Sequence, residues 1–213
     1  MKRILIVDDH NIVREGVMRL LRELLEFPVD FDEAATGQQA IEKVSGGGAY
    51  HMVLLDISMP GRSGLDVLKQ IRQLNPELPV LMLSMYSDEQ YAVRALRAGA
   101  AGYLNKASAS EEFKSAIEKV LSGAKYVSPL QGNLLAEAIS EAIDPAMLHK
   151  LLSDREYQFA CMLTQGKTMT EIARELSLSV KTVSTYRARV LEKLKLRTNA
   201  EVINYCLTHG IVM

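Results

Sequence analysis

The chain has 213 residues, 48% of them hydrophobic, which is enough apolar material for two modest cores, so we expect two domains. Its formal net charge of −1 excludes a uniformly basic or acidic protein. The charge is uneven, however: residues 147–213 carry 10 Lys and Arg against 6 Asp and Glu, whereas residues 1–125 sum to −2 and residues 126–146 to −3. The C-terminal part is therefore the candidate for binding a polyanion.

The N-terminus does not predict a secretion signal. Met1-Lys2-Arg3 precedes an apolar run, but Asp8-Asp9 ends that run well short of the hydrophobic region of a signal peptide. No stretch approaches the roughly 18 apolar residues that a membrane span requires. Cys161 and Cys206 have no CxxC spacing and fall in helix-like apolar patterns, so we expect small buried hydrophobic residues. These features predict a soluble protein of the cytoplasm.

Strand-like and helix-like segments alternate over residues 1–122. Short continuous apolar runs are typical of strands buried on both faces of a parallel sheet, and they occur at 4–7, 52–55, 80–83 and 101–104. A less regular strand is expected at 29–35, where acids interrupt the apolar pattern. Helices are predicted at 12–25, 38–44, 65–74, 89–98 and 111–121. Five strand-helix repeats predict an α/β domain with a doubly wound parallel sheet.

The alternation stops after residue 122. Residues 123–146, which lack Lys and Arg from 126 onward, are interpreted as a partly helical linker. Residues 147–213 show only helical patterns, with closely spaced start and stop signals. These signals are capping boxes at 153–156 and 198–201, a cap at Ser179, and the glycines Gly166 and Gly210. They predict an all-α domain of four short helices.

Polar residues follow the predicted strands of the first domain: Asp8, Asp9, Asp56, Ser84 and Lys106. The carboxyl ends of parallel strands meet at one edge of the sheet, where ligands bind. Each residue alone has an ordinary explanation as a helix cap, a turn residue or a solvated lysine. Their joint occurrence in this order instead predicts phosphoryl transfer to a carboxylate.

The predicted roles follow from the chemistry of these groups. Three close acids repel one another unless a cation such as Mg²⁺ lies among them. Asp56 is the expected nucleophile, with the metal and Lys106 neutralising charge on the phosphoryl group. Ser84 is expected to donate a hydrogen bond to a phosphoryl oxygen and to draw its loop inward, which is the basis of a switch.

Two helices of the second domain, at 170–175 and 179–194, flank the short turn 176–178 and predict a helix-turn-helix. Between 181 and 197 there are six basic residues and one acid, as expected for contacts to nucleic-acid phosphates. An ordinary solvated amphipathic helix is the alternative. The predicted core face of the second helix consists of Val183, Tyr186, Val190 and Leu194, and the opposite face of Lys181, Ser184, Thr185, Ala188 and Glu192.

Residues 1–122 resemble the receiver domain of two-component response regulators. The motifs are Asp8-Asp9, Asp56-Ile-Ser-Met-Pro60, Leu83-Ser84 and Gly102-Tyr-Leu-Asn-Lys106. The resemblance implies a flavodoxin-like fold, phosphorylation of Asp56 by a sensor histidine kinase, and Mg²⁺ held by Asp9, Asp56 and the backbone carbonyl of Ser58, with Asp8 acting through water. It also implies that the rotamer of Tyr103 follows Ser84, although an ordinary aromatic residue at the sheet edge is the alternative.

Two positions depart from the receiver pattern. Met85 stands where many receivers have a small residue, and Ala107 replaces the usual proline after the lysine. Both departures bear on the lifetime of the phosphoryl group rather than on function.

The C-terminal region resembles the LuxR-type DNA-binding domain, and the whole chain resembles response regulators of the NarL/FixJ class. The motifs are Leu152-Ser-Asp-Arg-Glu156, Thr170-Glu-Ile-Ala173, Leu178-Ser-Val-Lys-Thr-Val183 and Leu191-Glu-Lys-Leu194. The resemblance implies base contacts from Ser184, Thr185 and Ala188. It implies phosphate contacts from Lys181, Thr182, Arg187, Arg189 and Lys193. Because the family often has a lysine where this chain has Ser184, the preferred DNA sequence does not transfer.

The resemblance also implies partners. The final helix pairs two domains on DNA in this family, so Val202, Ile203 and Cys206 are expected to be either core residues or dimer contacts. The partners implied for the whole chain are a sensor histidine kinase, promoter DNA, a second copy of the chain and RNA polymerase. The predicted function is a transcription factor controlled by phosphorylation.

Three other functions agree less well with the sequence. A haloacid-dehalogenase-like phosphatase needs a second acid two residues after its nucleophile, but Ser58 occupies that position. A regulator with an unphosphorylated receiver is disfavoured by the complete set of polar residues at the strand ends. A LuxR regulator that senses a small molecule is disfavoured because the N-terminal half forms a receiver. No enzyme activity is expected beyond the receiver's own phosphorylation and dephosphorylation.

Overall fold

The computed structural model describes residues 1–85, 89–128, 131–132 and 148–211. The chain divides into two compact units, Met1–Gly132 and Asn133–Met213. Most of the predicted linker, 123–146, lies outside the described residues, so its partly helical character stays a prediction.

The first unit contains a five-stranded parallel sheet with the order β2-β1-β3-β4-β5. Its strands are β1 (Lys2–Val7), β2 (Val29–Ala34), β3 (Met52–Asp56), β4 (Val80–Ser84) and β5 (Gly102–Asn105). The predicted doubly wound sheet is confirmed, including the irregular strand β2. Strand β2 lies on one side of β1, and β3, β4 and β5 follow one another on the other side. The direction in which strands are added to the sheet therefore reverses between β1 and β3, where a sheet of this kind forms its binding crevice.

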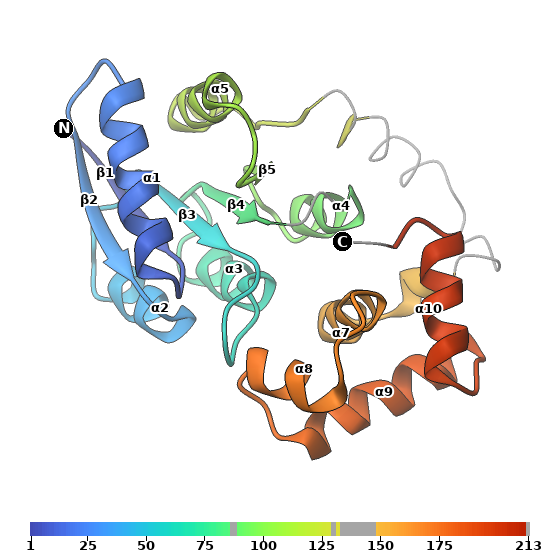
Figure 1. Cartoon of the computed structure of the whole chain (residues 1–213). Coiled ribbons are helices and arrows are strands. Elements are labelled where there is room, and N and C mark those ends of the chain that lie inside the picture. The colour runs from blue at the N-terminus through green and yellow to red at the C-terminus, as the bar shows by residue number, and fades with distance from the viewer. Residues whose placement is uncertain (86–88, 129–130, 133–147, 212–213) are drawn as a thin grey trace. The chain divides into compact units, whose positions relative to one another are not determined.

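Helices cover both faces of the sheet (Figure 1). They are α1 (Asn11–Leu24), α2 (Gly37–Ser45), α3 (Gly64–Leu74), α4 (Glu89–Arg97) and α5 (Ser110–Leu121). Alternate strand residues such as Ile4 and Leu54 pack with Leu21 of α1 and Ile117 of α5 in one core cluster. The intervening residues Leu5 and Val53 are equally buried. Because side chains alternate along a strand, they face the opposite layer, which contains α2 and α3.

The segment that follows α5 contacts the sheet of the first unit. Tyr126 forms an isolated parallel bridge with Gly102 at the edge of β5, and its N–H donates to the carbonyl of Ala101 over 2.8 Å. A Cβ added at Gly102 would lie 2.8 Å from the Tyr126 carbonyl oxygen. The missing side chain of Gly102 therefore admits the segment that leaves α5.

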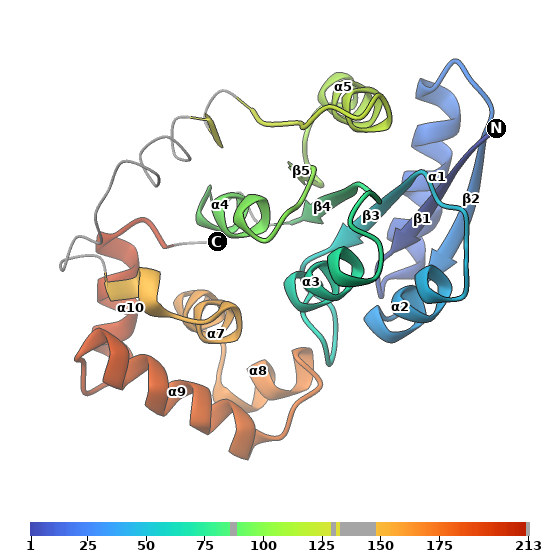
Figure 2. The same ribbon diagram turned by 180° about the vertical axis from the view of Figure 1, so that it is seen from behind.

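The described part of the second unit is helical (Figure 2). Its elements are η1 (Leu148–Leu151), α7 (Asp154–Thr164), α8 (Met169–Glu175), α9 (Val180–Leu194) and α10 (Asn199–Thr208). Both predicted capping boxes are confirmed, and α8 has a third, between Thr168 and Glu171. Between α8 and α9, Ser177 has a φ of 52°, which allows the tight turn without a glycine.

Side chains from all these helices form the core of the second unit. Val183, Val190 and Leu194 of α9 are buried as predicted, and so are Cys161 and Cys206. The prediction that Tyr186 is a core residue is wrong, since its side chain is only half-buried. A tyrosine at the rim of a core buries its ring while its hydroxyl reaches water.

Candidate functional site

The sheet brings the predicted acidic residues and the lysine together. Asp8 follows β1 and Asp56 ends β3, and both are 2% exposed. The ammonium of Lys106, which follows β5, lies 2.5 Å from Asp8 Oδ2 and 3.0 Å from Asp56 Oδ1. Ser84 ends β4 and is fully buried, and its carbonyl accepts the N–H of Lys106 over 2.7 Å. Four strand ends thus gather two buried carboxylates around one cation.

The electrostatics of this cluster are set by burial and by the three charges. Burial raises the pKa of Asp56 to about 6; the cation of Lys106 opposes this rise and the charge of Asp8 adds to it. Burial alone would lower the pKa of Lys106, but the two carboxylates outweigh it, so the net shift is upward. At neutral pH Asp56 is therefore largely ionised and able to act as a nucleophile.

Asp8, Asp9 and His10 each offer an atom that could hold a metal ion, and these atoms lie within 4.8 Å of one another. Within the described residues, no hydrogen-bond donor satisfies the buried Oδ1 of Asp9, although His10 Nδ1 lies 3.2 Å away. The backbone N–H of Ser58 donates to the Asp56 carboxylate, which places Ser58 beside it. A buried carboxylate oxygen without a donor, with the Asp8 carboxylate close by, suits a hard cation such as Mg²⁺. The residues present therefore fit this metal.

Tyr103 occupies the middle of β5, opposite Met82 of β4, and is 3% exposed. Its carbonyl accepts a hydrogen bond from the Gln131 side chain over 3.2 Å. β5 is the last strand of the sheet, so this position agrees with a switch aromatic and also with an ordinary edge aromatic.

The loop after Asp56 depends on Gly64, the first residue of α3. The N–H of Gly64 donates to the Ile57 carbonyl over 2.9 Å. A Cβ added here would overlap the backbone oxygen of Asp56. Gly64→Ala is therefore expected to lower the free energy of unfolding by about 3 kcal/mol, because it overpacks a backbone contact. Urea unfolding measures this change.

Gly16→Ala is the matched control, because an added Cβ there meets nothing within 4 Å and Gly16 lies inside helix α1. It should stabilise the protein by about 0.5–1 kcal/mol. Equal unfolding midpoints for Gly64→Ala and the wild type would contradict the close approach of these two backbones.

The predicted DNA-reading residues all lie on α9, which runs between α8 at one end and α10 at the other (Figure 2). Five of them are exposed: Lys181, Ser184, Thr185, Ala188 and Arg189. Thr182 is half-buried and its hydroxyl lies 2.8 Å from that of Ser179, the helix cap. The exposed set forms a surface of small and basic side chains that suits insertion into a groove.

Two of the predicted phosphate-binding cations are engaged inside the domain. Arg187 Nε donates to Asn199 Oδ1 of α10 over 2.6 Å. The Lys193 ammonium lies 2.6 Å from Glu156 Oε2 of α7 and 3.1 Å from the Leu151 carbonyl. Burial would raise the pKa of Glu156, but hydrogen bonds from Lys193 and Ser153 lower it below its usual value. Arg187 and Lys193 therefore hold α9 against its neighbours, and their phosphate contacts stay predictions.

The final helix shows which residues belong to the core. Val202 and Cys206 are buried, which favours the core alternative for both, and Ile203 is half-buried. Leu207, which the sequence analysis missed, is 57% exposed on the same helix. Of the three predicted residues, Ile203 therefore stays the candidate for a contact with a second copy.

Comparison with known proteins agrees with both halves of this description. Residues 4–118 match the family model of the response regulator receiver domain, and residues 150–206 match that of bacterial regulatory proteins of the luxR family. The chain belongs to the response regulators. The order of its two domains confirms the predicted receiver and LuxR-type helix-turn-helix architecture.

Relatives match this response regulator over nearly its whole length. It is 35% identical to the response regulator UvrY of Escherichia coli strain K12, over 99% of this chain and 96% of the relative. It is 32% identical to the response regulator GacA of Pseudomonas aeruginosa, over 100% and 98%. No helix in the described part of the chain is long and apolar enough to cross a membrane. The chain is a regulator rather than a metabolic enzyme.

Solved structures show the same architecture. RcsB of Salmonella enterica serovar Typhimurium, bound to promoter rprA in the presence of the phosphomimetic BeF3−, is 25% identical with a TM-score of 0.63, over 96% of this chain and 98% of that one. A LuxR-family regulator from Aurantimonas is 34% identical with a TM-score of 0.58, over 65% and 98%. The predicted fold class is confirmed.

Arg189 tests the electrostatic part of the interface. It is exposed on α9, in the most basic segment of the regulator. Arg189→Ala is expected to weaken binding to specific and random DNA alike and to reduce the slope of log affinity against log salt by about 1, because the predicted phosphate contact would be lost. Binding titrations at several salt concentrations measure the slope, with Arg19→Ala on the exposed surface of α1 as control. Lost discrimination between sequences with an unchanged slope would mean that Arg189 reads bases.

Proposed function

We propose that this response regulator is a transcription factor whose binding to promoter DNA is controlled by phosphorylation of Asp56 by a sensor histidine kinase. The observation that carries the proposal is the placement of Lys106 between two buried carboxylates, at 2.5 Å from Asp8 and 3.0 Å from Asp56. A buried cation next to a buried nucleophile is the arrangement that stabilises charge on a transferring phosphoryl group.

The phosphoryl transfer uses the residues of this site. A carboxylate oxygen of Asp56 attacks the phosphorus of a phosphohistidine; the P–N bond breaks, and the imidazole leaves as an acyl phosphate forms on Asp56. Asp9, Asp56 and the Ser58 carbonyl would hold Mg²⁺ directly and Asp8 through water. The bound metal would neutralise negative charge on the phosphoryl oxygens. The regulator's own dephosphorylation by water belongs to the same proposal.

The switch begins at Lys106 and Ser84. When the phosphoryl group is present, its oxygens compete with Asp8 for the Lys106 ammonium and accept a hydrogen bond from the Ser84 hydroxyl. Tyr103, buried two residues along the neighbouring strand, then changes rotamer. The hydrogen bond from the Ser84 hydroxyl would draw Ser84 and its loop inward.

The second domain would bind the promoter DNA. Ser184, Thr185 and Ala188 would contact base edges, with the Ala188 methyl group against a thymine methyl. Lys181, Thr182, Arg187, Arg189 and Lys193 would bind phosphates. Leu207 and Ile203 of α10 would contact a second copy of the chain, so that two chains bind inverted half-sites of the DNA. The protein would act in the cytoplasm, with RNA polymerase as a further partner.

The proposal is tested by the mass of the protein in solution and by DNA selection. With Mg²⁺ and acetyl phosphate, light scattering should show a shift from monomer towards dimer. DNA recovered from a random pool should become enriched in a two-fold symmetric sequence only in the phosphorylated sample. The same mass and the same enrichment without the phosphodonor would contradict control by phosphorylation and favour a constitutive regulator.

A further inference from the structure

Arg14 is a buried cation whose position needs an explanation. It lies in the first turns of α1 and is 8% exposed. A positive charge at this end of a helix opposes the helix dipole, and burial of a guanidinium is unfavourable unless it is hydrogen-bonded. The sequence analysis did not select Arg14, although a basic residue just after the helix start was the available signal. Specific partners must therefore stabilise it.

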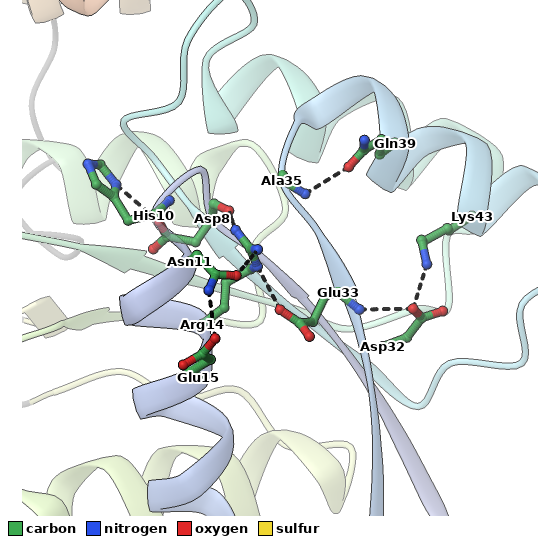
Figure 3. A network of polar contacts seen from close by, with 10 residues as sticks. All are labelled: Asp8, His10, Asn11, Arg14, Glu15, Asp32, Glu33, Ala35, Gln39 and Lys43. Carbon is green, nitrogen blue, oxygen red and sulfur yellow. Dashed lines mark hydrogen bonds and ion pairs between the residues drawn. The ribbon is translucent and has the colours of Figure 1, made fainter.

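Figure 3 shows these partners. Arg14 Nη1 donates to the backbone carbonyl of Asp8 over 2.8 Å, and Nε donates to Glu33 Oε2 of β2 over 2.8 Å. Nη2 donates to Asn11 Oδ1 over 2.7 Å, and the Asn11 amide in turn donates to Glu15 over 2.6 Å. The planar guanidinium thus joins the start of α1, strand β2 and the loop after β1.

The carbonyl that Arg14 binds belongs to the peptide group between Asp8 and Asp9. Asp8 is held independently: its N–H donates to the Ala34 carbonyl over 3.1 Å, and its side chain accepts the His10 N–H over 2.8 Å. The buried Oδ1 of Asp9 accepts no hydrogen bond within the described residues, and its one recorded side-chain contact there is His10 Nδ1 at 3.2 Å. The peptide plane that Arg14 fixes is therefore one determinant of the direction of the Asp9 carboxylate, beside the contact with His10.

We propose that Arg14 is a positioning residue for the divalent cation site, which it serves by fixing the Asp8–Asp9 peptide group. This inference rests on the proposed function, because it takes Asp9 to be a metal ligand. Arg14 itself touches no reacting atom and acts through the backbone. Lysine cannot replace it, because a single ammonium does not present the planar fork that reaches three acceptors in three elements.

The test is a calorimetric titration of the unphosphorylated protein with Mg²⁺ alone, for the wild type, Arg14→Ala and Arg14→Lys. Both variants are expected to bind Mg²⁺ about tenfold more weakly, as is typical when a residue that orients a metal ligand is lost. Arg19→Ala is the control, because Arg19 lies on the same helix and pairs with Glu23 on the exposed surface. It should bind Mg²⁺ as the wild type does.

A second readout separates positioning from a purely structural role. The Mg²⁺ concentration that gives half-maximal phosphorylation by acetyl phosphate should rise about tenfold in the Arg14 variants, while the rate at saturating Mg²⁺ stays within about twofold. A residue that only stabilises the fold would lower the unfolding midpoint and leave the Mg²⁺ dependence unchanged.

Each outcome decides the proposal. If Arg14→Ala does not fold, the same Mg²⁺ titration is carried out with Arg14→Lys and with Glu33→Gln. Glu33→Gln removes the charged partner of Arg14 Nε. Folded Arg14 variants with wild-type Mg²⁺ affinity would overturn the positioning role and leave the proposed function standing. A wild type that neither binds Mg²⁺ nor takes up a phosphoryl group would overturn the proposed function, and this inference with it.

Discussion

Asp56→Ala is expected to abolish phosphoryl uptake from a phosphorylated kinase domain or from acetyl phosphate. Asp56 is the carboxylate at the end of β3 that is 2% exposed and paired with Lys106, and the proposed transfer uses its carboxylate oxygen as the nucleophile. The fold should stay intact, since the substitution also removes the repulsion between two buried acids. Intact-protein mass spectrometry after incubation with the phosphodonor measures uptake.

Asp66→Ala is the matched control, because Asp66 is an exposed acid ten residues further along, in the first turn of α3. It should take up phosphoryl groups as the wild type does. Phosphorylation of Asp56→Ala to the wild-type extent would remove Asp56 from the assignment and place the acceptor elsewhere.

Lys106→Ala is expected to destabilise the protein by about 3 kcal/mol without Mg²⁺, because it leaves the carboxylates of Asp8 and Asp56 buried without their cation. Mg²⁺ should restore much of this loss, since a divalent cation neutralises the same carboxylates and binds only the folded state. The stabilisation by Mg²⁺ should therefore be larger for the variant than for the wild type. Urea unfolding with and without Mg²⁺ measures both effects.

The loss of stability in Lys106→Ala should also depend on pH. Lys106 lowers the pKa of Asp56, so its removal raises that pKa further above about 6. As the pH falls, Asp56 of the variant takes up a proton first and the repulsion with Asp8 disappears. The difference in stability between variant and wild type should thus narrow as the pH falls from 7 to 5. Lys125→Ala, which alters an exposed lysine, is the control, and its stability relative to the wild type should depend neither on Mg²⁺ nor on pH. A difference in stability between Lys106→Ala and the wild type that does not change with pH would contradict the pairing of Lys106 with Asp56.

The sheet and the cluster at its edge could be predicted because they depend on local patterns. Continuous apolar runs identify buried strands, and in a parallel sheet every strand presents its carboxyl end at the same edge. The placement of Asp8, Asp56, Ser84 and Lys106 near one another follows from that rule alone. The last strand spans Gly102–Asn105, one residue later than predicted, but Lys106 still follows its carboxyl end.

Other features could not be predicted because they depend on contacts between distant residues. Tyr126 packs against β5, and Arg187 and Lys193 bond to α10 and α7, although periodicity places both basic residues only on a solvated helix surface. Arg14 was missed for the same reason: Asn11 is a local neighbour on the same helix, but Glu33 of β2 comes next to Arg14 only in the fold.

The most direct test of the central proposal is the affinity for the selected DNA, measured side by side for the wild type and Asp56→Ala with Mg²⁺, with and without acetyl phosphate. Acetyl phosphate should strengthen binding by the wild type and leave Asp56→Ala unchanged. If the acidic cluster at the sheet edge is a phosphorylation site, only the phosphorylated wild type should bind this DNA tightly. Equal affinities in all four samples would contradict a phosphorylation switch.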